Sequence, residues 1–115
     1  MCFPDLHVPT ELALSAYRPV SGKADELQVF FADELATLRR RGHVTERRAP
    51  VVRTDSGEFL VVLEWSSDHA VADAHEDPEI LELWRRKSEL ADYVAPRELA
   101  GSDVPFARWT IVADV

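Results

Sequence analysis

The sequence predicts an α+β domain in which two helices cover one face of a four-stranded antiparallel sheet. Two long segments, 24–41 and 78–93, space their apolar residues as amphipathic helices do. Two others, 11–18 and 59–65, alternate their side chains as strands do. Prolines and glycines suited to turns fall between these segments. With two further strands, the order is β-α-β-β-α-β, that of a ferredoxin-like two-layer sandwich.

The first strand follows a segment, residues 1–10, that holds two prolines and no periodic pattern and is expected to be irregular. Within 11–18, Leu12, Leu14 and Ala16 share one face of the strand. The opposite face carries Ala13, Ser15 and Tyr17. Both faces therefore offer apolar side chains for burial.

The first helix is expected over 24–41, where the apolar residues recur every three or four positions. They are Leu27, Phe31, Leu35 and Leu38. The arginines at 39–41 suit the negative end of the helix dipole, and Gly42 is well placed to end the helix. The next segment, 43–54, is rich in Val, Thr and Arg and is predicted to be the second strand, bent at Pro50.

The third strand, 59–65, has the clearest pattern in the chain and follows a predicted turn at 55–57. One face carries Phe59, Val61, Leu63 and Trp65, and the other carries Leu60, Val62 and Glu64. Because both faces are largely apolar, we expect this strand at the centre of the sheet, buried on both sides.

The second half of the chain is predicted to form two helical pieces and the fourth strand. A short helix starts at Ser66 or Ser67 and runs to about His75. The sequence Asp77-Pro78 indicates a new helix start, and the second piece is expected to reach about Tyr93. The last strand is expected over 106–112.

Two helices can cover only one face of such a sheet, although the third and fourth strands are apolar on both faces. The open face needs a partner, and a second copy of the chain is the simplest one. We therefore expect a homodimer through the open sheet face. Residues 1–115 are expected to be one domain, with a ferredoxin-like core over 11–112.

Composition excludes several function classes. A net charge of −8 works against binding to nucleic acid. No apolar run is long enough to cross a bilayer, so no membrane partner is expected. The start of the chain lacks a signal-peptide pattern, and its single cysteine, Cys2, fits a reducing cytoplasm.

Six arginines nevertheless gather in one short stretch. They are Arg39, Arg40, Arg41, Arg47, Arg48 and Arg53. Such a cluster is able to bind a carboxylate or a phosphate. A solvated helix end followed by an exposed strand is the simpler explanation. The sequence leaves both interpretations open.

No cofactor or metal is expected from the motifs. The chain has no phosphate-binding glycine loop, no cluster of zinc ligands and no nucleophile elbow. His75 is the candidate catalytic residue, because a histidine near the predicted helix break can act as a general base. It can equally be a structural residue that bonds orphan backbone groups at the helix junction.

Three aromatic residues are candidates for the wall of a substrate pocket. Trp65 ends the apolar face of the third strand, Trp84 belongs to the second helical stripe, and Tyr17 ends the first strand. They either pack in the core or line a flat apolar pocket between helices and sheet. The sequence does not decide between these interpretations.

The chain resembles the antibiotic biosynthesis monooxygenase-like proteins of the dimeric α+β barrel superfamily. The resemblance rests on the strand 58–65, on Ser66, Ala70, Ala74 and His75 after it, and on the helix that contains Trp84. It implies that two sheets join into a barrel and that small ligands lie between helices and sheet. It also implies a monooxygenase or other oxidoreductase that works without a cofactor on an aromatic substrate.

In that reading Trp65 and Trp84 frame the substrate, His75 takes a proton and Arg47 holds an anionic group. The chain departs from the polyketide oxygenases of this family, which place an asparagine and a tyrosine where Val61 and Val71 stand. Trp84 occupies the position of the axial histidine of haem-degrading members. The competing hypothesis is a dimeric ligand-binding or accessory domain without catalytic activity, in which the tryptophans are core residues.

Overall fold

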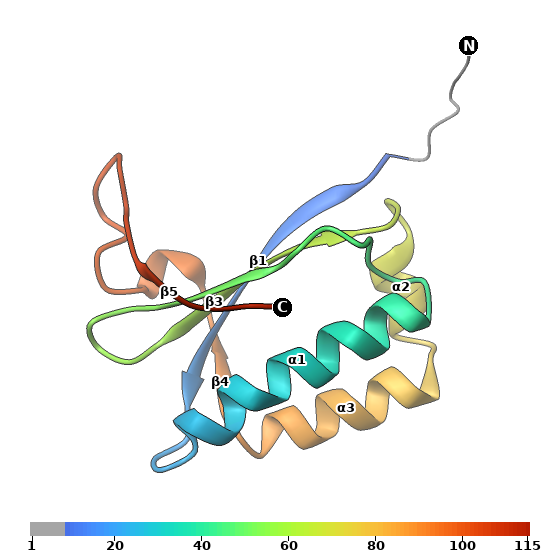
Figure 1. The fold of residues 1–115 in the computed structure, drawn as a ribbon, viewed down its shortest axis with the longest axis horizontal. Coiled ribbons are helices and arrows are strands. Elements are labelled where there is room, and N and C mark those ends of the chain that lie inside the picture. The colour runs from blue at the N-terminus through green and yellow to red at the C-terminus, as the bar shows by residue number, and fades with distance from the viewer. Residues whose placement is uncertain (1–8) are drawn as a thin grey trace.

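The computed structural model describes residues 9–115 as a sheet with helices packed against it (Figure 1). Two of the helices, α1 and α3, lie side by side on one face of the sheet. The elements are β1 (Glu11–Pro19), α1 (Ala24–Arg40), β2 (Pro50–Arg53), β3 (Phe59–Trp65), α2 (Ala70–Ala74), α3 (Pro78–Ser88), β4 (Ala91–Val94), the 3₁₀ helix η1 (Pro96–Glu98) and β5 (Thr110–Asp114).

The sheet has five strands in the order β4-β1-β3-β2-β5, and all neighbours run antiparallel. The central position predicted for the third strand is confirmed, because β3 lies between β1 and β2. The order of the first four strands is compatible with a ferredoxin-like α+β fold. The prediction of four strands is wrong, since β5 adds a fifth strand beside β2.

The largest error of the prediction concerns the segment after α3. The helix predicted to reach Tyr93 ends at Ser88, and residues 91–94 form the edge strand β4. β4 is only four residues long and depends on its pairing with β1. Such a pairing cannot be recognised from local periodicity. The strand predicted over 106–112 is β5, which begins at Thr110, so Phe106 lies in the loop before it.

Two other boundaries also differ. The predicted strand 43–54 is a strand only from Pro50, the strand position at which proline is best tolerated. Its first part makes a single bridge between Val44 and Trp65. The short helix begins at Ala70 rather than at Ser66 or Ser67, because Ser67 forms the turn before it.

Several predicted elements are confirmed. The first strand, the first helix and the third strand lie within one or two residues of the predicted bounds. The side chain of Asp77 accepts a hydrogen bond from the amide of Glu79 and caps α3, with Pro78 in the first turn. The 55–57 turn is also present, with Gly57 at a φ of 94°.

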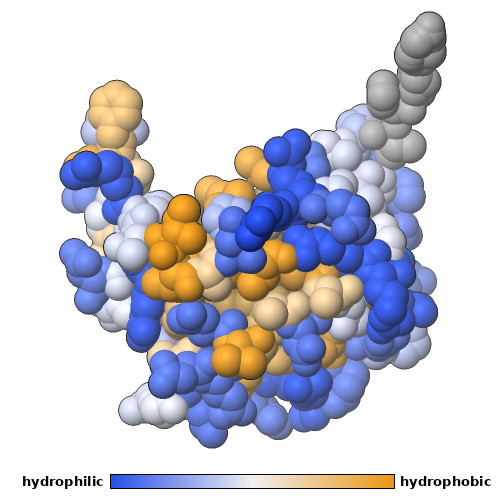
Figure 2. Space-filling model, viewed as in Figure 1, coloured by the Kyte–Doolittle hydropathy of each residue, from blue (hydrophilic) through white to orange (hydrophobic). Residues whose placement is uncertain are grey.

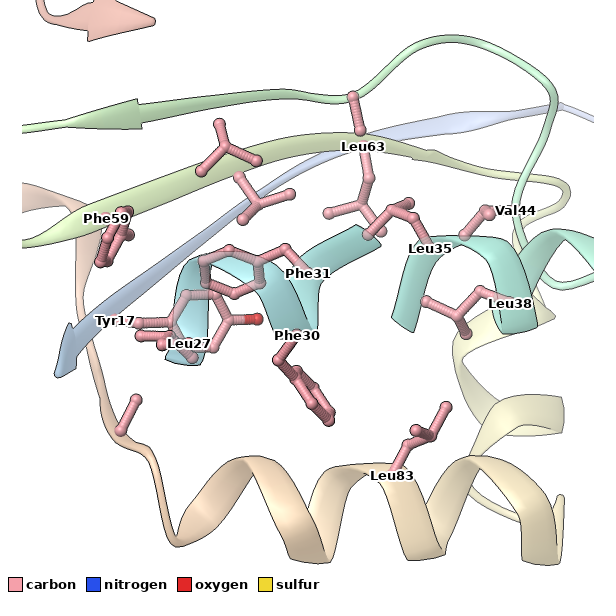
Figure 3. Packing of buried hydrophobic residues seen from close by; sticks show 14 of the residues in the cluster. Tyr17, Leu27, Phe30, Phe31, Leu35, Leu38, Val44, Phe59, Leu63 and Leu83 are labelled. Carbon is pink, nitrogen blue, oxygen red and sulfur yellow. The ribbon is translucent and has the colours of Figure 1, made fainter. Parts of the chain in front are cut away.

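The main core lies between the helices and the sheet (Figure 3). The ring of Phe31 from α1 contacts Tyr17 of β1 and Phe59 of β3, at centroid distances of 5.3 and 5.7 Å. Such offset and edge-on arrangements are favourable for aromatic pairs. The faces of β1 and β3 that carry Tyr17 and Phe59 therefore both point at the helices.

The rear face of the sheet is covered only in part. A small cluster joins Ala16 of β1 and Leu60 of β3 to Leu99, which follows η1. The amide of Ala100 donates to the buried carboxylate of Glu58 and ties this segment to the sheet. Toward the start of β1 the same face is open, and Leu14 is half exposed.

The segment between η1 and β5 projects from the body of the molecule (Figure 1). Figure 2 shows apolar as well as polar side chains on this projection, and apolar side chains near the middle of the face in view. Among residues 9–115, no helix has the length and apolar character that a membrane span requires. The irregular segment predicted for residues 1–10 lies, up to residue 8 and with Cys2, outside the described residues.

Candidate functional site

A pocket of about 440 Å³ lies between the helical layer and the sheet. Strands β1 and β3 form one side of it, and the three α-helices contribute residues to the other sides. Its lining includes Tyr17, Trp65, His75 and Trp84. Four of the five predicted site residues, distant in the sequence, thus share one cavity.

The polar residues Tyr17, Glu34 and Lys87 line this pocket, and Lys87 is hydrogen-bonded to both of the others; we call the three the pocket floor. The ammonium group of Lys87 donates to Oε2 of Glu34 at 2.5 Å and to the Tyr17 hydroxyl at 3.0 Å. The indole Nε1 of Trp84 donates to the same carboxylate oxygen at 3.1 Å. The side chains of Glu34 and Lys87 are almost wholly buried.

Burial sets the ionisation of the floor. Removal from water raises the pKa of Tyr17 to about 12, against the opposing effect of the nearby Lys87 charge, so Tyr17 stays protonated. Burial alone would lower the pKa of Lys87, but the charge of Glu34, the nearby Tyr17 and Tyr93 and the hydrogen bond to Glu34 together outweigh this effect and raise the pKa. Lys87 is therefore charged and Glu34 balances it, so the floor carries no net charge.

His75 lies among the more exposed lining residues of the pocket, directly after α2. Its Nδ1 is 2.8 Å from the backbone oxygen of Val71. A carbonyl oxygen can only accept, so Nδ1 carries hydrogen and Nε2 of the neutral ring is free to accept a proton. The ring packs edge-on against Trp84 at a centroid distance of 4.8 Å.

Both interpretations of His75 therefore have a counterpart in the structure. The bond from Nδ1 to Val71 closes the last turn of α2, as a structural histidine would. The place of the ring in the lining of the pocket is what a general base requires. One side chain satisfies both descriptions.

Arg47 does not belong to the pocket. Its Nε donates to Oε1 of Glu64 at 3.1 Å, and Thr45 donates to the same oxygen. Glu64 points to the rear of the sheet, because Leu63 and Trp65 on either side of it pack with the helix-side core. Its two neighbours in sequence line the pocket, whereas Glu64 and Arg47 do not.

Most of the other clustered arginines are also engaged by the chain itself. Arg39 donates to the backbone oxygens of Thr45 and Arg47, and Arg40 pairs with Glu79. The remaining pairs are Arg41 with Asp77, Arg48 with Asp114, and Arg53 with the ring of Phe59. These contacts fit the interpretation of the cluster as a solvated helix end and strand.

Asp77 joins the helix junction beneath the pocket to the end of α1. Its Oδ2 lies 2.7 Å from Nε2 of His43 and 2.9 Å from Nε of Arg41. Hydrogen bonds from Arg41 and His43 hold the pKa of Asp77 well below its usual range. In the described part of the chain no three His, Cys, Asp or Glu side chains are grouped as a metal site.

Glu34 and Lys87 are not among the site residues that the sequence predicts. Their spacing carried a signal. Glu34 follows Leu27 by seven positions and Phe31 by three, so it lies on the buried stripe of α1. Lys87 stands in the same relation to Ile80 and Trp84 on α3. Opposite charges on facing apolar stripes predict a buried pair.

Comparisons of the chain with family models, with curated proteins and with solved structures gave no significant match.

Proposed function

We propose that this chain binds a small aromatic molecule in the pocket and catalyses its oxidation, with His75 as the general base. The observation that carries the proposal is the position of Trp65 and His75 in the lining of one cavity. An apolar wall with a few convergent polar groups is the usual make-up of a small-molecule site. The reaction class comes from the resemblance to the antibiotic biosynthesis monooxygenase-like proteins.

The aromatic residues suit a flat ligand. Trp65, Trp84 and Tyr93 line the pocket together with aliphatic residues such as Leu35 and Leu63. Aromatic side chains bury planar apolar groups effectively and orient them by edge or face contacts. In this proposal Trp65 and Trp84 frame the substrate.

The proposed chemistry starts with proton removal at a methylene carbon that is conjugated through aromatic rings to a ketone, as in an anthrone. Nε2 of His75 takes the proton and leaves a delocalised anion. This anion gives electrons to dioxygen, which is the co-substrate. One oxygen atom becomes a new carbonyl at the carbon, and the other leaves as water. The methylene carbon loses four electrons, and dioxygen gains the same four.

Oxygen uptake with a panel of quinols and anthrones tests this function. We expect turnover by the unsubstituted protein and a loss of about 10²- to 10⁴-fold in His75→Ala, the usual contribution of a general base. His69→Ala is the matched control, because His69 is an exposed histidine that binds Asp73 and does not line the pocket. Equal rates in both variants would contradict the role of His75.

The alternative function is ligand binding without catalysis. The hydrogen bond between His75 and Val71 favours it, because the histidine then has a structural task at the end of α2. In this case the panel members bind, measured by calorimetry, but none of them consumes oxygen. His75→Ala would then lower the melting temperature more than it changes the affinity.

We also propose that the protein is a cytoplasmic homodimer through the open part of the rear sheet face. Exposed apolar residues support this, since Leu12 on β1 is 66% exposed and Ile111 on β5 is 63% exposed. Phe106 on the projecting segment is 86% exposed. Apolar side chains exposed on one sheet face are typical of an interface between subunits.

Sedimentation of the unsubstituted protein and of Leu14→Glu tests the dimer. Leu14 is on the open rear face, so a carboxylate there would need to be desolvated in the interface. We expect a dimer that dissociates to a folded monomer in the variant. Val29→Glu is the control, because Val29 is exposed on α1, outside the rear face. A monomer at all concentrations of the unsubstituted protein would contradict the proposal.

A further inference from the structure

The pocket floor contains a buried carboxylate oxygen without a partner. Oε2 of Glu34 accepts from both Lys87 and Trp84, whereas Oε1 has no donor among residues 9–115. The Glu34 residue is only 4% exposed and lines the pocket. A buried acceptor without a donor is unfavourable, and a hydroxyl of a bound molecule would satisfy it.

The floor also contains an unused donor. The Tyr17 hydroxyl accepts from Lys87, so its own hydrogen points to another partner. In the described part of the chain it has none. Because its pKa is raised to about 12, the hydroxyl keeps this hydrogen at neutral pH. An oxygen of a bound molecule is the acceptor that it lacks.

The two unused groups lie close together. Tyr17 and the Glu34 carboxylate bind the same ammonium nitrogen, at 3.0 and 2.5 Å, so the phenol and the carboxylate that bears Oε1 are neighbours around Lys87. A ligand that satisfies both groups needs a donor and an acceptor near each other on one edge. Since Lys87 and Glu34 cancel in charge, that edge is expected to be neutral.

We propose that the pocket floor recognises a neutral aromatic molecule in which a hydroxyl lies next to a second oxygen, as in a catechol. The hydroxyl donates to Oε1 of Glu34, and the neighbouring oxygen accepts from the hydroxyl of Tyr17. The ring plane lies against Trp65 and Trp84, which line the same pocket. This inference rests on the proposed function, because it specifies the ligand of the same pocket.

Three naphthalenes that share one ring system test the recognition by calorimetry. 2,3-Dihydroxynaphthalene has two neighbouring hydroxyls, 2-naphthol has one hydroxyl and no second oxygen, and 2,3-dimethoxynaphthalene keeps both oxygens without a donor. We expect the dihydroxy compound to bind about tenfold more tightly than either of the others, the effect of one buried hydrogen bond. Experiments without oxygen keep the catechol reduced.

Tyr17→Phe identifies the donor. We expect it to lower the affinity for the dihydroxy compound about tenfold and to leave the affinity for 2-naphthol unchanged, because 2-naphthol lacks the second oxygen. Tyr93→Phe tests the competing donor, since Tyr93 lines the same pocket but is 62% exposed, so water can satisfy its hydroxyl and equal weakening there would assign the contact to Tyr93. Circular dichroism checks the fold, and if Tyr17→Phe is unfolded the ligand series on the unsubstituted protein decides alone.

The outcomes separate this inference from the proposed function. Equal affinity for the three compounds, with loss of binding of all three in Trp84→Ala, would overturn the proposed recognition of neighbouring oxygens. It would still support a pocket that binds aromatic molecules. Equal weakening by Tyr17→Phe and Tyr93→Phe would also overturn it. No binding by any of the compounds would overturn both the recognition and the pocket as an aromatic site.

Discussion

The two faces of the sheet are similar in sequence but differ in what covers them. On the helix side, Leu63 of β3 is 6% exposed beneath the helices. On the rear side, Leu14 of β1 is 52% exposed, although Ala16 on the same strand is 2% exposed beneath Leu99. One strand thus has an open and a covered half on the same face.

The difference shows that coverage depends on distant segments and not on the strand itself. The helix side is covered by α1 and α3, whose apolar stripes match the sheet along its length. Within residues 9–115, the rear side is covered by the turn after η1, held through the bond from Ala100 to Glu58, and by Trp109. The helix side therefore contains both the core and the pocket, and the rear side keeps exposed apolar residues such as Leu14.

The largest expected effect is on the helix side, at the buried ion pair. Lys87→Met should lower the free energy of unfolding by about 3–5 kcal/mol, because it leaves the Glu34 carboxylate buried without its counter-charge. Chemical denaturation measures this change. Arg85→Met, on the exposed side of the same helix, removes pairs with Glu82 and Glu89 and should have little effect.

A comparable loss in both variants would show that the helix, and not the buried pair, responds to the substitution. Restoration of stability in Lys87→Met by Glu34→Gln would attribute the loss to the uncompensated carboxylate.

The same substitution on the two faces compares them directly. Leu63→Ala should cost about 2–5 kcal/mol of stability, because it opens a cavity in the core. Leu14→Ala should cost far less in the monomer, because its side chain already contacts solvent. If the rear face pairs with a second copy, the cost of Leu14→Ala rises with protein concentration. Equal costs at every concentration would mean that the two faces do not differ.

This contrast also explains what the sequence was able to predict. The alternation along β1 and β3 and the stripe of α1 were long enough to define these elements, although both faces of the strands are apolar and the inward one was not assigned. The edge strand β4 was not, because Leu90, Ala91 and Val94 continue the helical spacing and no Gly or Pro separates them from α3. Its strand conformation comes from pairing with β1, which is a tertiary contact.

The site was predicted to a similar extent. Tyr17, Trp65 and Trp84 were identified because aromatic residues at the ends of apolar patterns are conspicuous. Arg47 was misplaced because the direction of a loop arginine depends on the partner that it finds, here Glu64. The floor residues Glu34 and Lys87 were missed because each looks solvated until the opposite helix is in place.

A smaller effect is expected at Glu58, which accepts a hydrogen bond from Ala100 in the segment after η1. Hydrogen bonds from Arg18, Ser56 and Ala100 outweigh the effect of burial and lower the pKa of Glu58 below its ordinary value of 4.5. The stabilisation by Glu58 is therefore present above that value and is lost as the pH falls through the folded-state pKa. Glu58→Gln should cost about 1–2 kcal/mol at pH 7 and less at pH 3.

Proteolysis gives a second measurement of the same contact. Glu58→Gln should speed cleavage between Leu99 and Thr110, because the segment loses its tie to the sheet. Glu98→Gln is the control, since Glu98 is exposed on η1 and does not bind the sheet. A difference between Glu58→Gln and the parent protein that persists unchanged at pH 3 would contradict the assigned role of the charge.

The smallest effect concerns the titration of the pocket floor. The pKa of Tyr17 is raised to about 12 because burial disfavours the phenolate. Its ordinary value is 10.0, so the folded state resists ionisation, and stability should decline as the pH rises from 10 toward 12. Absorbance at the phenolate band should show an upper transition that Tyr17→Phe removes and Tyr93→Phe does not. A single transition near 10 in the folded protein would mean that the floor is open to water, and the contrast between a closed helix side and an open rear side would then fail at the pocket.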